Sequence, residues 1–330
     1  MVAYTGIQGQ NILIVSSDPA NPTEGQIWYN STSNLLKGYA NVVTNAWASG
    51  GSLNTARQGI AGVGTQTASL GFGGYLTAAT TGATELYNGT SWTTSPATMG
   101  TSRYILSGSG TQTSALAFGG ANPGKTGATE LFNGTAWTSN PTGLNTSRQG
   151  IAGSISGTQT AALAFGGWLQ PGSSTASESW NGTSWTNTPS LNTARNSLIG
   201  CGTQTASLAF GGNVAPAPGN SSSTESWNGS TWTTLPATMN TARAGLGSAG
   251  TQTAALGFGG YTNVRTGATE LYNGTSWTSN PTGLATARNY IGGSGTQTAG
   301  LAFAGSTGSN SAATEEWTGT AVAVRTITTS

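Results

Sequence analysis

Residues 57–103 read RQGIAGVGTQTASLGFGGYLTAATTGATELYNGTSWTTSPATMGTSR, and the same order of features recurs along the 330-residue chain. The tetrapeptide GTQT begins at six glycines that are 45 to 48 residues apart: Gly64, Gly110, Gly157, Gly202, Gly250 and Gly295. An apolar stretch with a glycine pair or its near equivalent follows each copy, and Thr-Ala-Arg or Thr-Ser-Arg opens the next. A period this regular indicates a repeat architecture in which each repeat is one supersecondary unit.

Within one repeat the residues favour strands. Residues 85–93 read ELYNGTSWT, which is rich in β-branched and aromatic residues on either side of Asn88-Gly89. Asn-Gly is the strongest signal for a two-residue hairpin turn, which would set Glu85 opposite Trp92. No segment has a convincing period of 3.6 residues. Four short strands in about 46 residues predict an all-β fold, a β-propeller of four-stranded blades.

The order of features within each repeat resembles the kelch repeat. In the first copy the features are Gly73-Gly74, Glu85, Tyr87, Trp92, Met99 and Arg103. The resemblance extends over residues 52–322 and implies kelch-like blades. The last copy departs from the pattern, with Ala304 in place of one glycine and Val322 where tryptophan is expected.

The number of blades depends on how the N-terminal segment is interpreted. Residues 35–49 look like the third and fourth strands of one more blade, with Trp47 in the tryptophan place, and residues 26–30 and 10–16 could supply its other two strands. We therefore expect seven blades, with residues 1–50 as a divergent first blade and residues 51–330 as six kelch-like repeats. The alternative is a six-bladed ring with residues 1–50 as an N-terminal attachment module.

Opposite charges keep the register of the repeats. Six of the eight arginines and six of the nine acidic residues recur once per unit, and a carboxylate between packed blades needs a partner. Pairing with the following blade would leave Arg57 facing Lys37, so pairing within each repeat is expected. The predicted structural ion pairs are Arg57 with Glu85, Arg103 with Glu130, Arg148 with Glu178, Arg195 with Glu225, Arg243 with Glu270, and Arg288 with Glu315.

The composition argues against several classes of partner. Charged residues make up 6% of the chain, far below the roughly 25% of an average soluble protein, and the net charge is +1. Nucleic acid and anionic lipid require clustered Lys and Arg, so neither is an expected partner. No apolar run is long enough to cross a bilayer, and the start MVAYTGIQGQ lacks the features of a signal peptide. We expect a soluble chain made in a cytoplasm.

The residue inventory also argues against catalysis. The absence of histidine removes Ser-His-Asp and Cys-His systems and the usual zinc and copper sites. The single cysteine, Cys201, is expected to be a buried, inert thiol. Glycosidase chemistry requires two nearby carboxylates, and six of the nine acidic residues already belong to the predicted ion pairs. We therefore expect no catalytic residue, no metal and no cofactor.

The loops that follow the glycine pairs differ most between repeats and should emerge on one face of the ring. They contain the candidate binding residues Tyr75, Trp168, Tyr261 and Arg265, which suit stacking on sugar rings or seating a partner loop. The alternative is that these aromatic residues only cap the blade edges. Kelch members that bind partners often use the second residue after the blade-opening arginine. Here those residues form a weak recognition set: Gly59, Ile105, Gly150, Ser197, Gly245 and Tyr290.

The segment TGIQGQNILIVSSDPANPTEGQIWYNSTSNLLKGY (5–39) resembles N-terminal modules of structural proteins from tailed phages. That resemblance implies a virion component, namely a decoration, fibre or tail-associated propeller made in the host cytoplasm. Its partners would be other virion proteins or a cell-surface glycan or protein, with a homo-oligomer left open. The alternative is a soluble kelch adaptor that binds a glycan or a protein outside any virion.

Overall fold

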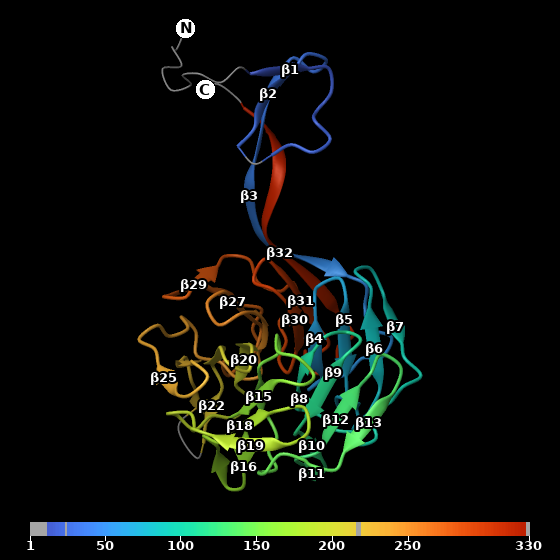
Figure 1. Cartoon of the computed structure of the whole chain (residues 1–330), viewed down its shortest axis with the longest axis vertical. Helices are drawn as coiled ribbons and strands as arrows, with labels where there is room; N and C mark the ends of the chain where they lie inside the picture. Colours follow the sequence, from blue (N-terminus) through green and yellow to red (C-terminus); the bar gives the residue numbers. More distant parts are fainter. Residues whose placement is uncertain (1–11, 24, 216–218, 328–330) are drawn as a thin grey trace. The chain divides into compact units, whose positions relative to one another are not determined.

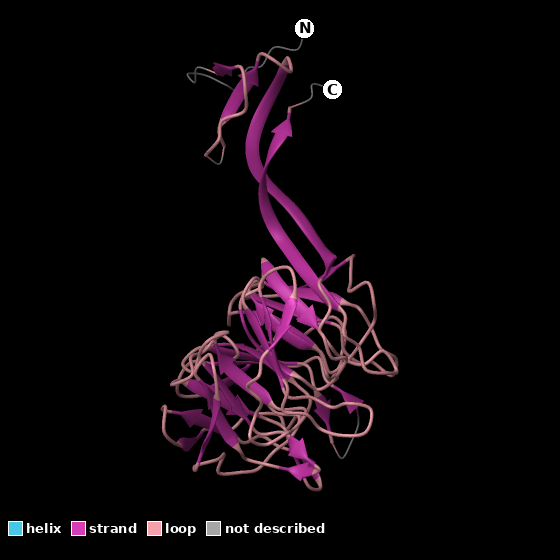
Figure 2. Cartoon of the chain, turned by 90° about the vertical axis from the view of Figure 1, so that its right-hand side faces the viewer, coloured by secondary structure: helices cyan, strands magenta, loops and turns pink. Residues whose placement is uncertain are grey.

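The computed structural model describes residues 12–23, 25–215 and 219–327, with the side chains of 40–44 and 320–325 left out (Figure 1). The segment MVAYTGIQGQ lies outside the described residues. The described part is built from strands and loops and has no helix (Figure 2), so it offers no helix that could span a membrane. The chain divides into two compact units. Unit 1 comprises residues 1–45 and 318–330, and unit 2 comprises residues 46–317.

Five four-stranded sheets in unit 2 each come from one repeat, and all their neighbouring strands are antiparallel. The first is β4 (Ala61–Gly64), β5 (Ser69–Phe72), β6 (Thr84–Tyr87) and β7 (Trp92–Thr94). The second is β8 (Ser107–Gly110), β9 (Ala115–Phe118), β12 (Thr129–Phe132) and β13 (Trp137–Asn140). The third is β14 (Ala152–Gly153), β15 (Ala162–Phe165), β18 (Ser177–Trp180) and β19 (Trp185–Thr188).

The next two repeats have the same strand order. The fourth sheet is β20 (Ile199–Gly202), β21 (Ser207–Phe210), β24 (Thr224–Trp227) and β25 (Trp232–Thr234). The fifth is β26 (Gly247–Gly250), β27 (Ala255–Phe258), β28 (Thr269–Tyr272) and β29 (Trp277–Asn280). Three loops carry short hairpins: β10 (Ala121–Asn122) with β11 (Gly124–Lys125), β16 (Trp168–Leu169) with β17 (Gly172–Ser173), and β22 (Asn213–Val214) with β23 (Gly219–Asn220).

The sixth repeat completes its sheet with a strand from the N-terminal part of the chain. The sheet order is β30 (Gly292–Gly295), β31 (Ala299–Phe303), β32 (Thr314–Thr326), β3 (Leu35–Gly50), β2 (Ile27–Asn30) and β1 (Leu13–Val15). The sequence predicts two strands within residues 35–49 and a separate sheet around them. The structure instead has one continuous strand there, and the described strands of that segment belong to the sheet of the sixth repeat.

Trp47 places this N-terminal strand in the sixth sheet through the contacts that tryptophans make in the other repeats. In the first repeat, the indole Nε1 of Trp92 donates a hydrogen bond to Thr314 Oγ1 at 2.9 Å. Thr314 belongs to the sixth repeat, which lies next to the first. Trp47 Nε1 donates to Thr269 Oγ1 at the same distance and packs its ring on Phe258 and Trp317. Trp47 therefore takes the tryptophan place of the sixth sheet, for which the sequence offers only Val322.

The hairpin between the third and fourth strands is two residues longer than predicted. Tyr87 lies opposite Trp92 and Glu85 lies opposite Thr94, so residues 88–91 form a four-residue loop. Asn88 Oδ1 accepts hydrogen bonds from the backbone N–H groups of Thr90 and Ser91, and this side-chain cap stabilises the wider turn. A shift of two residues preserves the face on which side chains lie, so Glu85 and Trp92 still share one face.

Glycine in the innermost strands allows neighbouring sheets to pack closely. A Cβ atom at Gly108 on β8 would lie 2.6 Å from the ring of Phe72, which ends β5 of the preceding sheet. The core of unit 2 combines such aromatic rings with buried aliphatic side chains. Phe72, for example, also contacts Trp137 of the second sheet, with 5.0 Å between the ring centroids.

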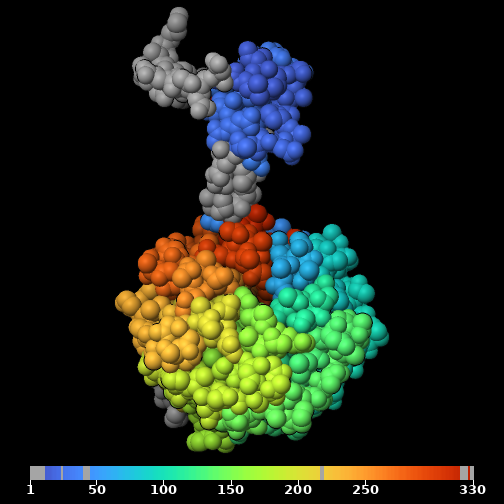
Figure 3. Space-filling view, viewed as in Figure 1, coloured from blue at the N-terminus to red at the C-terminus, as the bar shows by residue number. Residues whose placement is uncertain are grey.

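The six repeats are joined in cyclic order. The innermost strands contact one another in the sequence β4, β8, β14, β20, β26, β30 and back to β4. The side-chain amide of each GTQT glutamine donates to two backbone carbonyls of the preceding repeat, as Gln112 does to Ser69 and Tyr87. Gln66 makes the same bonds to Gly300 and Trp317, which joins the first repeat to the sixth. The sequence colours of Figure 3 follow this order around unit 2.

In unit 1, Asp18 organises the chain between β1 and β3. Its carboxylate accepts hydrogen bonds from Trp28 Nε1 at 3.1 Å, Asn30 Nδ2 at 2.8 Å and Lys37 Nζ at 2.7 Å. These three donors, with Lys37 the strongest, lower the pKa of Asp18 to about 2. Lys37, which aligns with the repeat glutamates in the sequence, therefore pairs with a carboxylate of its own unit.

Candidate binding face

The six residues that lie two positions after each blade-opening arginine form a closed ring of backbone hydrogen bonds. We call this the axial ring, and its members are Gly59, Ile105, Gly150, Ser197, Gly245 and Tyr290. Each backbone N–H donates to the carbonyl of the preceding member at 2.6–3.0 Å, and Gly59 donates to Tyr290 to close the circle. All six have positive φ angles, between 47° and 63°.

Glycine alternates with larger residues around the axial ring. A Cβ atom at Gly59 would lie 3.1 Å from Ile105, and one at Gly245 would lie 3.2 Å from the ring of Tyr290. Each glycine thus leaves room for the side chain that follows it. The three larger residues are held in the left-handed conformation, which costs an L-residue roughly 1–2 kcal/mol relative to its usual backbone. Such strain is typical of sites where function requires a particular side chain.

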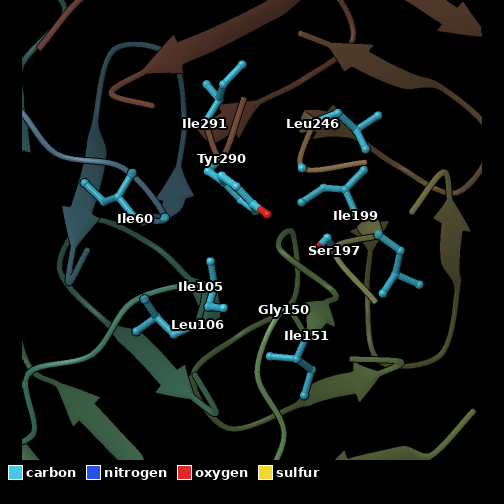
Figure 4. Close-up of a pocket in the computed structure, with 13 residues that line it drawn as sticks. Ile60, Ile105, Leu106, Gly150, Ile151, Ser197, Ile199, Leu246, Tyr290 and Ile291 are labelled. Atoms are coloured by element: carbon cyan, nitrogen blue, oxygen red, sulfur yellow. The ribbon is translucent and has the colours of Figure 1, made fainter. Parts of the chain in front are cut away.

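Beneath the axial ring lies an apolar collar, formed by the next residue of each repeat. Its members are all buried: Ile60, Leu106, Ile151, Leu198, Leu246 and Ile291. Figure 4 shows the collar around a small cavity of about 60 Å³, with the ring of Tyr290 extending towards its centre. The axial ring and the collar line this cavity together, so a ligand that entered it would contact residues of the axial ring.

The residues just before the axial ring connect it to the variable loops. Gln58 forms a bridge with Tyr75, Gln149 with Trp168, and Ala244 with Tyr261. The predicted binding residues therefore lie on one face, around the axial ring. They are spread over the first, third and fifth repeats, and among the described residues no ring contact joins them. Tyr75 instead contacts Tyr104 at a tilt, with 5.3 Å between the ring centroids.

Arg265 lies beside Tyr261 in the loop of the fifth repeat, where the two residues form a bridge. Its Nη2 lies 3.5 Å from Ser306 Oγ of the sixth repeat, and the side chain is otherwise exposed. Arg265 does not line the hollow described next.

Next to Tyr290 the face is hollowed. A depression of about 240 Å³ is lined by Gln58, Gly59, Tyr104, Ile105, Gln149 and Tyr290. The sequence predicts binding residues in the variable loops and only weak recognition by the axial-ring residues. The available signal was that Ile, Ser and Tyr occupy three positions at which the other repeats have glycine.

The opposite end of the innermost strands forms a wider bowl of about 420 Å³, lined mainly by glycine and threonine of the GTQT loops. The third repeat has two more residues than the others between its arginine and GTQT. They cross this bowl: Ser156 bonds through its N–H to Gly202 O at 3.1 Å and through its hydroxyl to Gly250 O at 2.7 Å. Buried Ile155 lies at the base of the bowl.

The side chains of the repeat glutamates are buried in unit 2. Each pairs with the arginine of its own repeat, at N···O distances of 3.1 Å (Arg57–Glu85), 3.1 Å (Arg103–Glu130), 2.7 Å (Arg148–Glu178), 2.8 Å (Arg195–Glu225), 3.1 Å (Arg243–Glu270) and 3.1 Å (Arg288–Glu315). These are the within-repeat pairs expected from the sequence. Burial lowers the pKa of Arg103 to about 10, although the charge of Glu130 opposes that shift.

Each of these glutamates also holds the backbone ahead of its arginine. Glu130 accepts hydrogen bonds from the N–H groups of Gly100 at 2.6 Å and Thr101 at 3.2 Å. The carboxylate thus fixes the guanidinium and also the backbone that enters its own sheet, which is a structural role. Cys201 is likewise buried; its thiol donates to Thr251 O, and burial raises its pKa.

Within the described residues, no cluster of three or more His, Cys, Asp or Glu side chains could hold a metal ion. A scan of protein-family models gives no match to this chain, and a search of curated proteins gives none either.

Proposed function

We propose that unit 2 is a six-bladed β-propeller that binds a partner and has no catalytic role. Three sets of contacts support the count of six, because each runs through the six repeats and returns to the first. They are the axial ring, the glutamine bonds to the preceding repeat, and the bond from each second glycine of a pair to the next arginine carbonyl, which ends with Gly305 N–H to Arg57 O at 2.9 Å.

The observation that carries the binding role is the face around the axial ring. There the axial ring holds three side chains on a strained backbone, beside a hollow lined by tyrosines and glutamines. Aromatic residues lie in the surrounding loops. The repeat carboxylates, which could otherwise act as acids or bases, are buried against arginines. Concave sites with aromatic walls and a few polar groups are typical of binding sites.

We propose further that the protein is a structural component of a phage virion, a decoration, fibre or tail-associated propeller, and that this face mediates attachment or assembly. Support comes from the resemblance of residues 5–39 to tailed-phage structural proteins and from the low content of charged residues. Purified particles should contain the protein in a fixed ratio to the major capsid protein, measured by quantitative mass spectrometry after density-gradient purification. Recovery only from the particle-free lysate would contradict the proposal.

A further inference from the structure

The hollow beside the axial ring presents neutral chemistry alone. Its side chains are two tyrosines, two glutamines and one isoleucine, and none of its lining residues is charged. The repeat arginines that precede its lining residues are fully buried and paired with glutamates: Arg57, Arg103, Arg148 and Arg288. A phosphate, sulfate or carboxylate would find no counter-charge here, and such groups need one when they leave water.

The lining residues suit a ligand with both apolar C–H faces and hydroxyl groups. Tyr290 lies with Cδ1 and Cε1 of its ring against Gly245 and remains 38% exposed, so part of the ring is open to a ligand. Tyr104 and Ile105 add apolar surface beside it. Gln58 and Gln149 carry amide groups that both donate and accept hydrogen bonds, which matches the alternating needs of sugar hydroxyls. An aromatic ring supplies a large contact area at low conformational cost.

The backbone at Ile105 and Tyr290 gives a second, independent reason to assign a role to these side chains. Glycine occupies the equivalent place in three repeats and would relieve the left-handed strain at both positions. The fold therefore does not require a side chain there. A strained residue that retains a large side chain beside a hollow is most simply explained by what that side chain contacts.

We propose that this hollow binds a neutral hexose or N-acetylhexosamine unit of a glycan, with Tyr290 as the stacking platform and Gln58 and Gln149 as hydrogen-bonding partners. The proposal rests on the binding function proposed above and specifies its ligand class. A protein loop is the competing occupant, and the experiment distinguishes the two.

The test uses the full-length protein on an array of neutral hexose- and N-acetylhexosamine-terminated oligosaccharides with sialylated and sulfated counterparts, followed by calorimetric titration of the best neutral ligand. Tyr290→Gly retains the backbone conformation and should weaken binding about tenfold or more. Tyr290→Asn, which also tolerates a positive φ, should do the same. Val264→Ala truncates a side chain that is 68% exposed and does not line the hollow, so it should leave the affinity within about twofold.

Preferential binding of charged glycans, or no binding of neutral glycans at millimolar concentration, would overturn the proposal. Equal losses in Val264→Ala and Tyr290→Gly would overturn it too. Thermal unfolding of each variant shows whether a loss reflects misfolding. If particles still carry the protein but no neutral glycan binds, the ligand assignment fails while the virion proposal stands, and a protein partner is then indicated.

Discussion

Replacing Arg103 by methionine tests whether the buried ion pairs hold the sheets together. Arg103 is fully buried; its Nη2 lies 3.1 Å from Glu130 Oε1, and its Nη1 donates to Ala128 O at 2.5 Å. Removing one member of a buried pair leaves an uncompensated charge and costs about 3–5 kcal/mol. The lost bond to Ala128 adds about 1 kcal/mol. We expect a decrease of about 4–6 kcal/mol in the free energy of unfolding, from a total that is typically about 5–15 kcal/mol.

The double variant Arg103→Met/Glu130→Gln identifies the cause. It removes the uncompensated charge, and its amide oxygen can still accept one of the two backbone N–H bonds that Glu130 accepts from Gly100 and Thr101. The double variant should therefore recover about 2 kcal/mol or more of the loss. If contacts of the arginine side chain alone were responsible, the second change would recover nothing.

Urea unfolding followed by tryptophan fluorescence, with linear extrapolation to water, measures these free energies. Arg265→Met is the matched control, because Arg265 is exposed and no carboxylate pairs with it among the described residues. Its effect should stay within about 0.5 kcal/mol. The reasoning is refuted if Arg103→Met costs no more than Arg265→Met, or if the double variant is less stable than the single one.

Three further outcomes follow from single contacts. Gln112→Leu leaves two backbone carbonyls of the preceding repeat without their side-chain donor and should cost about 1–3 kcal/mol in the same assay; an unchanged value would mean that water replaces the amide. Trp47→Ala removes the ring and indole bond that complete the sixth sheet, so we expect a loss of about 3–5 kcal/mol, and a loss under 1 kcal/mol would contradict that role. The Asp18 pKa is lowered from 3.8 to about 2, so its stabilising effect is fully present above pH 4 and is lost as the pH falls towards 2. The NMR signal of the Trp28 indole N–H should titrate with a midpoint near pH 2 and lose this step in Asp18→Asn; a midpoint near 3.8 would show that the native bonds do not favour the carboxylate.

The sequence alone predicts the periodic parts of the structure. The GTQT period predicts the repeats, and the alternation of apolar and small residues predicts strands. The recurrence of Arg57 and Glu85 in every repeat predicts their ion pair, which the structure shows at 3.1 Å. These features are local or recur in every unit, so a single pattern determines them all. The hairpin at Asn88 was predicted two residues too short because an Asn-Gly pair also suits a four-residue loop in which the asparagine side chain bonds two backbone N–H groups.

The contacts that depend on chain closure could not be predicted. Trp47 bonds to a residue 222 positions away, and no local pattern indicates which sheet its strand will join. Side-chain type alone makes the axial-ring positions a weak recognition set, whereas the proposal for this face depends on the backbone geometry at Ile105 and Tyr290, which sequence patterns do not reveal. The glutamine of GTQT resembles any polar loop residue until the neighbouring repeat supplies its carbonyl partners.

The strand that carries Trp47 sets an order of events on the ribosome. It is synthesised before any of the six repeats, yet its partners Phe258 and Trp317 belong to the fifth and sixth repeats. A nascent chain must therefore keep this strand unpaired while the other sheets form, and contacts of such large sequence separation are the slowest to be made. Until β32 leaves the ribosome, β3 lacks this partner, and its unpaired edge could bind a strand of a second nascent chain. If ribosomes are widely spaced on the messenger RNA, β3 should pair with the sixth sheet of its own chain rather than with a strand of a neighbouring nascent chain.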